Sequence, residues 1–270
     1  MSKDIQQQKK FKILLIGESC TDEYVYGEIA RISPEAPVPV LKEKKRIEKL
    51  GMSGNVLSNI CSMLGKERVD LFIHQNNHNK IKKIRYIDNK SNYQLMRHDI
   101  EDEIDPLLYK DIDTDQEYDV IVISDYNKGY VSKSLIFKIK KHFKNIKMFV
   151  DTKKRDISCY SWDEQRAIVK INQKERNEVV NAHMCDIITT LGAEGCEYQF
   201  KKYKANKVDV SDVCGAGDVF LAALVARWLE TKDIINSIKT ANNCASLSVT
   251  KVGCYTLSRE EYENEINAAD

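Results

Sequence analysis

The chain alternates between short apolar runs and segments in which apolar positions recur with helical spacing. Runs of strand length occur at residues 11–17, 69–75, 118–124, 147–152, 167–172 and 185–191. The amphipathic segments 55–65 and 132–144 predict helices between them, and Ser132 is placed to cap the start of the second. This alternation predicts an α/β fold in which helices flank a mostly parallel sheet. In such sheets, ligands bind beyond the carboxyl ends of the strands.

Two segments interrupt the alternation. Residues 24–46 hold three of the chain's four prolines, and residues 83–99 have the pattern of two strands around an "NKSN" turn. Because proline cannot donate a hydrogen bond to a central ladder, residues 34–40 favour an edge strand or an extended arm. Together the two segments predict a small β-sheet lid on a single α/β domain that spans residues 1–270.

Composition and charge argue against several classes of function. The 42 basic residues are balanced by 41 acidic ones, so nothing in the net charge of +1 favours nucleic acid or an anionic membrane as a partner. The apolar runs are far shorter than the roughly 20 residues that span a bilayer, and the start of the chain lacks the apolar stretch of a signal peptide. Its eight cysteines contain no C-x-x-C pair, which is typical of reduced thiols. We therefore expect a cytoplasmic protein that binds a small molecule.

The stretch "VCGAGDV" at residues 213–219 is the clearest candidate for chemistry. A helix start exposes backbone N–H groups and the positive end of the helix dipole, and glycines let a phosphate approach that backbone closely. Gly215, Ala216 and Gly217 are therefore predicted to form an anion hole. Asp218 is then placed to take a proton from a hydroxyl that attacks the bound phosphoryl group. The same residues also suit a tight turn followed by a favourable first-turn acid.

The wider segment "DVCGAGDVFLAAL" resembles the C-terminal signature of the ribokinase-like carbohydrate kinases. Further blocks are similar, in the expected order, to the D-glycero-β-D-manno-heptose 7-phosphate kinase branch: 17–40, 124–130, 150–160, 172–175, 190–195 and 241–253. "RISPEAPVPV" and "SDYNKG" are typical of that branch, whereas "GAGD" and "N-x-x-E" mark only the superfamily. The resemblance covers nearly the whole chain and implies a ribokinase-like fold, with ATP and Mg²⁺ as cofactors.

The resemblance assigns roles to individual residues. Asp22, Gly51 and Asn55 correspond to positions that bind the sugar, although Asp22 and Asn55 would also suit a turn and a helix cap. In the "N-x-x-E" motif, Asn172 corresponds to a nucleotide-phosphate position and Glu175 to a carboxylate that holds magnesium, generally through water. The remaining nucleotide-binding positions are Thr190, Gly192, Gly195 and Asn242.

A substrate that carries its own phosphate needs a second set of cations. Lys128, Lys153 and Arg155 follow predicted strands at the ligand-bearing edge of the sheet and could supply this charge. The alternative for each is ordinary solvated surface charge. The resemblance also implies a homodimer formed through the lid, and it leaves open whether a monovalent cation is required.

Several positions depart from the branch. Met52 stands where relatives have a second glycine in the sugar loop, which could narrow the sugar pocket, and Glu18 stands where they usually have Asp. The regions 65–83 and 175–186 are too short for the helices expected there, which predicts a sheet with incomplete helical cover and exposed apolar surface.

We therefore expect ATP-dependent phosphorylation of D-glycero-β-D-manno-heptose 7-phosphate at its anomeric oxygen. Met52 favours a kinase of a different sugar as one alternative. The shortened regions favour another, a catalytically silent member that binds nucleotide or sugar and acts through a partner.

Overall fold

Two sheets organise the residues that the computed structural model describes, which are 10–161 and 167–269. The larger sheet, sheet A, has the strand order β12-β11-β10-β9-β8-β7-β1-β4. Its strands are β1 (Phe11–Gly17), β4 (Val69–Gln75), β7 (Val120–Asp125), β8 (Met148–Thr152), β9 (Ile168–Asn172), β10 (Asp186–Thr190), β11 (Cys196–Tyr198) and β12 (Lys201–Tyr203). In this sheet, β10, β9, β8, β7, β1 and β4 pair in parallel with their neighbours. At the opposite edge from β4, strands β11 and β12 pair antiparallel. The six predicted strands and the predicted α/β class are confirmed.

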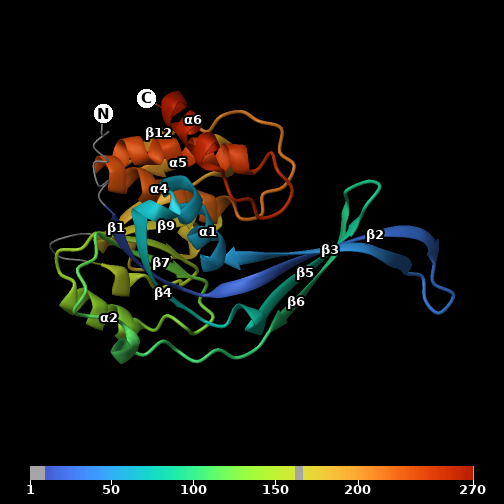
Figure 1. Ribbon diagram of the computed structural model, residues 1–270, viewed down its shortest axis with the longest axis horizontal. Coiled ribbons are helices and arrows are strands. Elements are labelled where there is room, and N and C mark those ends of the chain that lie inside the picture. Colours follow the sequence, from blue (N-terminus) through green and yellow to red (C-terminus); the bar gives the residue numbers. More distant parts are fainter. Residues whose placement is uncertain (1–9, 162–166, 270) are drawn as a thin grey trace, which may run out of the picture.

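Helices cover the two faces of sheet A unequally (Figure 1). One face packs against α1 (Ser53–Leu64), α4 (Ala216–Thr231), α5 (Ile234–Ser248) and α6 (Arg259–Ala269). The other packs against α2 (Lys133–His142), whose N-terminus is capped by Ser132 as predicted, since its hydroxyl oxygen accepts a hydrogen bond from Leu135 N at 3.1 Å. Ile13 and Leu15 of β1 point into the first core, and Leu14 and Ile16 into the second. Burial on both faces explains the unbroken apolar run.

The shortened regions do not leave the centre of the sheet bare. Residues 65–83 form β4 and two short 3₁₀ turns, with β5 beginning at Ile81, and residues 175–186 hold only the short helix α3 (Gln173–Glu178) and a 3₁₀ turn. Irregular segments cover the α2 face instead, through Leu107, Ile112, Tyr118, Ile157 and Tyr160. The expectation of an exposed sheet is therefore wrong for the central strands. Among the described strands of sheet A, the exposed large apolar residue is Ile73, 42% exposed on the edge strand β4.

The smaller sheet, sheet B, projects from the domain as a long arm (Figure 1). It consists of β2 (Ser19–Ile32), β3 (Pro39–Met52), β5 (Ile81–Asp88) and β6 (Gln94–Glu101), in the order β3-β2-β5-β6. The proline-rich segment lies in the β2–β3 hairpin, and Pro39 is the first residue of the edge strand β3, where its missing N–H is tolerated. The arm is longer than predicted, because β2 already begins at Ser19 and β3 continues to Met52.

Glu18 joins the base of the arm to the carboxyl edge of sheet A. Its buried carboxylate accepts hydrogen bonds from the backbone N–H groups of Tyr126, Lys128 and Tyr130, at 2.7, 3.3 and 3.1 Å. Its own N–H donates to Ser124 O at 3.1 Å. The loop after β7 is thereby fixed beneath sheet B, close to the start of α4. None of the described helices is both long and apolar enough to cross a membrane.

Candidate active site

Helix α4 begins at the "GAGD" stretch, as predicted. Gly215 precedes it with φ 75° and ψ 0°, a left-handed conformation that favours glycine. A Cβ on Gly215 would also lie 2.7 Å from Asn55 Nδ2. Both the conformation and the crowding therefore require glycine here. Because the N-cap residue is a glycine, it has no side chain that could cap the backbone N–H groups of this helix start.

Asp218 lies in the first turn of α4 and is 3% exposed. Its Oδ1 accepts a hydrogen bond from the Tyr126 hydroxyl at 2.7 Å, and its Oδ2 accepts one from Asn55 Nδ2 at 3.2 Å. Burial raises the pKa of Asp218 to about 6; the Tyr126 hydrogen bond opposes this rise, and the nearby Asp151 carboxylate adds to it. A buried carboxylate that titrates near neutral pH has the properties of a general base.

A chain of charges lies beside Asp218 on the carboxyl ends of β8 and β9. Lys170 Nζ contacts Asp151 Oδ2 at 2.7 Å, and Lys153 joins Asp151 Oδ1 to Glu175 Oε1, at 3.3 and 2.6 Å. Although burial opposes it, these two lysines hold the pKa of Asp151 below its usual value. A Cβ on Gly217 would lie 2.7 Å from Lys170 Nζ, so this ammonium group borders the predicted anion hole.

The "N-x-x-E" motif forms a capping box at the start of α3. Asn172 Oδ1 accepts from Glu175 N at 2.9 Å, and Glu175 Oε2 accepts from Asn172 N at 2.8 Å. The other oxygen of Glu175 contacts Lys153. Glu175 and Asp151 thus bring two carboxylates to one edge of the site, and oxygen donors of this kind are what Mg²⁺ prefers. Each of these oxygens already contacts a lysine or a backbone N–H, so the donor set fits an Mg²⁺ ion held through water and not one bound directly.

A cavity of about 320 Å³ lies between the start of α4, helix α5 and the segment that follows β12. Predicted nucleotide positions line it together with part of the predicted anion hole: Thr190, Gly192, Gly195, Asn242, Ala216 and Gly217. Apolar side chains complete the wall, among them Val208, Val213 and Phe220. An apolar slot that opens beside a helix start suits a flat base joined to phosphates. Within it, Asn242 Nδ2 donates to Tyr203 O at 3.0 Å, which ties α5 to β12.

The predicted sugar positions lie on the lid side of Asp218. Asp22 of β2 is buried against Gly51 of β3, where a Cβ would lie 1.9 Å from Asp22 Oδ2. Asp22 Oδ1 pairs with the Arg85 guanidinium of β5, and Asn55 of α1 contacts Asp218. The structure therefore brings Asp22, Gly51 and Asn55 to one end of the site.

Met52 has a left-handed φ of 57°, a conformation more natural for the glycine that the resemblance places there. Its side chain packs in a small apolar cluster with Cys20 and Ile81.

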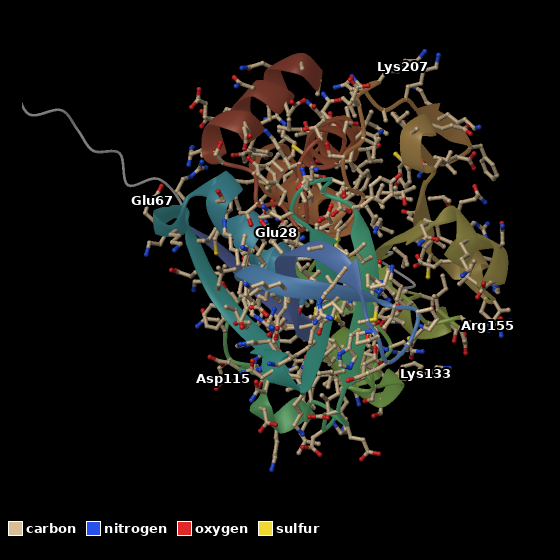
Figure 2. All side chains as sticks on the ribbon, turned by 90° about the vertical axis from the view of Figure 1, so that its right-hand side faces the viewer. Glu28, Glu67, Asp115, Lys133, Arg155 and Lys207 are labelled. Atoms are coloured by element: carbon tan, nitrogen blue, oxygen red, sulfur yellow. The ribbon has the colours of Figure 1, made fainter. Side chains whose placement is uncertain are left out.

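The three cations predicted for the sugar's phosphate do not converge. Lys128 pairs with Glu101 at 2.7 and 2.6 Å, Lys153 is held by two carboxylates, and Arg155 is exposed at the surface (Figure 2). Lys83 of β5 lies beside Tyr126, the hydrogen-bond partner of Asp218, because its Nζ is 5.3 Å from the centre of the Tyr126 ring. Lys153 Nζ lies 5.4 Å from the same ring centre.

Sequence reasoning missed Tyr126, Lys170, Asp151, Lys83 and Arg85. For Lys170 and Asp151 the signal was present, since each is a charged residue within an apolar strand run, where an unpaired charge would be costly. Lys83 and Arg85 lie on alternate positions of a lid strand, and only the folded arm shows that they reach the site.

Comparison with known proteins identifies the family. The profile of the pfkB family carbohydrate kinases matches residues 58–261, and the chain therefore belongs to this family. The bifunctional protein HldE of Aliarcobacter butzleri is 30% identical over 310 residues, an alignment that covers 95% of this chain and 65% of that protein. The chain thus spans 65% of the length of this relative. The alignment is longer than the 270-residue chain itself, so the relative carries additional residues within the matched region.

Solved structures confirm the ribokinase-like fold. Phosphofructokinase-2 from Escherichia coli, in complex with potassium, superposes with a TM-score of 0.72 at 15% identity, covering 97% of this chain and 99% of that one. Arabidopsis thaliana ribokinase, complexed with ribose and ATP, superposes with a TM-score of 0.65 at 14% identity, covering 95% and 99%. At these identities the likeness concerns the fold alone.

Proposed function

We propose that the protein transfers the γ-phosphoryl group of ATP to the anomeric oxygen of D-glycero-β-D-manno-heptose 7-phosphate, which gives the 1,7-bisphosphate. The observation that carries this proposal is the position of Asp218. It is a buried carboxylate with a pKa of about 6, set between the cavity at the start of α4 and the sugar positions Asp22 and Asn55. The choice of heptose rests on the motif resemblance of the sequence.

Each group has a role in this reaction. Asp218 Oδ accepts the proton of the anomeric hydroxyl, whose oxygen then bonds to the γ-phosphorus as the bond to the leaving ADP oxygen breaks. Tyr126 and Asn55 hold Asp218 in place. The 215–217 backbone and Lys170 stabilise negative charge on the transferred group. Glu175 and Asn172 would hold Mg²⁺ through water, and this ion would neutralise phosphate charge.

A substrate panel tests the proposal. ADP release would be measured with ATP, Mg²⁺ and a series of sugars and sugar phosphates, with an added K⁺ series to test the need for a monovalent cation. We expect the highest kcat/KM with the heptose 7-phosphate. Preference for another sugar would support the different-sugar alternative, and no turnover with any sugar, in protein that still binds ATP, would support a silent member.

Removing the Tyr126 hydroxyl should shift the fall of kcat/KM at low pH. The Tyr126 hydrogen bond favours ionised Asp218, so Tyr126→Phe is expected to raise the pKa of Asp218 above about 6. Because the ionised form is the active one, kcat/KM should fall as pH decreases through this pKa, and in the variant it should fall at a higher pH. The measurement is kcat/KM against pH for both proteins. If kcat/KM fell at the same pH in both proteins, the hydrogen bond of Tyr126 would not set the pKa of Asp218.

For the substrate's own phosphate, we propose that Lys83 and Lys153 contribute more than Lys128 or Arg155, since both ammonium groups lie over the Tyr126 ring. Charge-assisted contacts contribute roughly 1.5–3 kcal/mol. Lys83→Ala should therefore weaken sugar-phosphate binding by about one to two orders of magnitude and leave ATP binding nearly intact. Calorimetric titration of both ligands checks this, with Arg155→Ala as the control. Equal loss of ATP binding would assign Lys83 to the nucleotide.

We propose that sheet B pairs with the sheet B of a second copy. Every residue of β6 is exposed, and the arm carries exposed apolar side chains, including Tyr93 and Met96, which are 75% and 54% exposed. Light scattering should report a dimer at micromolar concentration, and Met96→Asp should shift it towards monomer. Phe137→Asp, which alters an exposed apolar residue of α2, is the control and should leave the dimer intact. An active wild-type monomer would contradict this assembly.

A further inference from the structure

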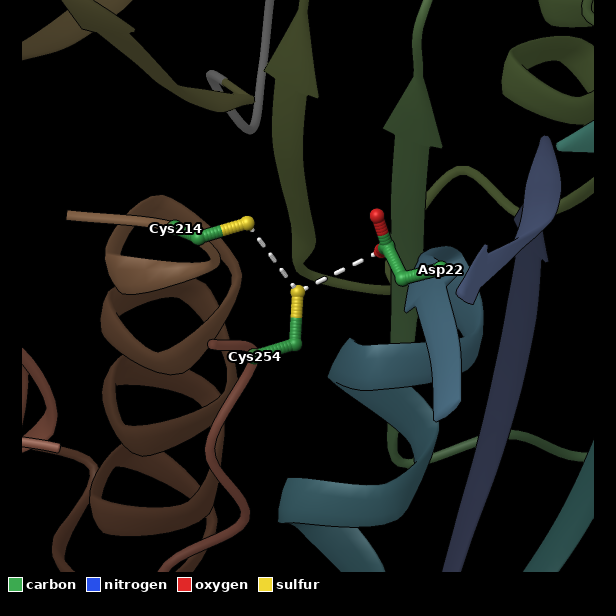
Figure 3. Close-up of side chains that lie close together, drawn as sticks. All are labelled: Asp22, Cys214 and Cys254. Carbon is green, nitrogen blue, oxygen red and sulfur yellow. Dashed lines mark hydrogen bonds between the residues drawn. The ribbon is translucent and has the colours of Figure 1, made fainter. Parts of the chain in front are cut away.

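Two cysteines meet beside the site (Figure 3). Cys214 immediately precedes the "GAGD" stretch, and Cys254 follows the turn after α5. Their sulfur atoms are 3.4 Å apart although the residues are 40 positions apart in the sequence. Cys254 is 4% exposed and Cys214 is half-buried, and both thiols are free.

The surroundings of the two sulfurs differ. Arg85 Nη2 lies 3.0 Å from Cys214 Sγ, whereas Cys254 Sγ lies 3.3 Å from the Asp22 carboxylate. The hydrogen bond between the two sulfurs lowers the pKa of Cys214 and the Arg85 guanidinium lowers it further, although burial and the Asp22 and Asp212 carboxylates oppose this. The same hydrogen bond, together with burial and Asp22, raises the pKa of Cys254. Cys214 therefore has the surroundings of a nucleophilic thiolate, with a neighbouring thiol in reach.

The position of Arg85 favours thiol chemistry over metal binding at the cluster of Asp22, Cys214 and Cys254. Its guanidinium contacts both Asp22 and Cys214, so the positive charge that the anions need is already supplied by the protein. This disfavours a metal ion at the same place and leaves the sulfur pair available for thiol chemistry.

We propose that Cys214 and Cys254 are a reversible modification site at which hydrogen peroxide oxidises the two thiols to a disulfide and thereby lowers the kinase activity. In the first step the Cys214 thiolate attacks the peroxide; an S–O bond forms, the O–O bond breaks, and the leaving hydroxide takes up a proton to become water. In the second step the Cys254 thiol loses its proton and attacks the sulfenic sulfur. The S–S bond forms, the S–O bond breaks, and the hydroxide leaves as water with that proton. Two thiols are oxidised, and one peroxide is reduced by two electrons.

The disulfide would disturb the site because of where the sulfurs lie. An S–S bond is about 2.05 Å long, so the sulfurs must approach each other by more than an ångström. The movement changes the contacts of Cys214 with Arg85 and of Cys254 with Asp22, and it displaces the residue that adjoins Gly215. We therefore expect turnover to fall by about 10²-fold, the size of loss that a misplacement of about 1 Å near reacting groups can cause.

Mass spectrometry tests the modification without reference to activity. The reduced full chain would be treated with hydrogen peroxide, its remaining thiols alkylated, and the digest searched for linked peptides. We expect a Cys214–Cys254 peptide that dithiothreitol removes. Cys214→Ser and Cys254→Ser should each lose this peptide. Cys185→Ser should keep it, because Cys185 is half-buried and burial raises the pKa of its thiol to about 11.

The effect of the disulfide on activity is tested by measuring turnover before and after peroxide treatment. Each variant is compared with its own reduced form. Peroxide should lower wild-type and Cys185→Ser turnover by about 10²-fold, reversibly, and should affect Cys214→Ser much less. In Cys254→Ser the Cys214 sulfenic acid lacks its resolving thiol, so any loss there should not be fully restored by dithiothreitol. Absence of the linked peptide from oxidised wild type would overturn the proposal, and a linked peptide with unchanged turnover would overturn its regulatory part. This readout depends on the proposed kinase function. If no sugar is phosphorylated, the linked peptide still decides whether the disulfide forms.

Discussion

Asp218→Asn is expected to lower kcat by about 10²–10⁴-fold while leaving ATP affinity little changed. The substitution keeps the size of the side chain and one acceptor oxygen for the Tyr126 hydroxyl, loses the oxygen that accepts from Asn55, and removes the group that accepts the proton. Steady-state kinetics and calorimetric titration of ATP would be carried out on both proteins. Raising the pH should not restore the activity, whereas it should restore that of Tyr126→Phe.

Asp209→Asn is the matched control, because Asp209 is an exposed acid in the segment that leads to α4. It should retain near wild-type turnover. If Asp218→Asn kept wild-type turnover, the assignment of Asp218 as the base would be wrong.

Lys170→Met is expected to destabilise the fold by about 3 kcal/mol or more. Lys170 and Asp151 are 3% and 2% exposed, and their ion pair spans β8 and β9 in the middle of sheet A. Methionine keeps most of the side-chain volume, so the loss reports the removed charge, which leaves Asp151 with Lys153 as its partner. Urea unfolding gives the free energy of unfolding for each protein.

A double variant separates the charge from the packing. Lys170→Met combined with Asp151→Asn removes both charges of the pair and should recover a large part of the lost stability, because residue 151 then no longer carries a buried charge that has lost its nearer partner. A single Lys170→Met variant as stable as the wild type would show that this pair contributes little to the fold.

The sequence predicts the framework well because burial leaves a local pattern. The run at 11–17 is apolar throughout, since alternate residues of β1 enter cores on both faces of the sheet. Prolines and a turn motif likewise mark the arm. The cover of the α2 face was predicted wrongly, because scattered apolar residues such as Leu107 and Tyr160 bury that face without any helical period.

The part of the site that lies in one contiguous motif could be predicted from the sequence. The part that is assembled from distant elements could not. The "GAGD" stretch indicates a helix start and its acid on its own. The Tyr126 hydroxyl, the Arg85 guanidinium and the Cys214–Cys254 pair reach the site from separate loops and strands, and no spacing in one sequence indicates that they meet. The positions of Lys170 and Asp151 within apolar runs were the available signal, because a buried charge requires a partner.

We propose that one site transfers a phosphoryl group from ATP to the anomeric oxygen of a sugar that already carries a phosphate. The most direct measurement is the ³¹P NMR spectrum of a reaction with ATP, Mg²⁺ and D-glycero-β-D-manno-heptose 7-phosphate. We expect a new anomeric phosphate ester signal that grows with ADP, while the 7-phosphate signal persists and Asp218→Asn gives neither product. Release of inorganic phosphate alone, or an ester at another hydroxyl, would contradict it.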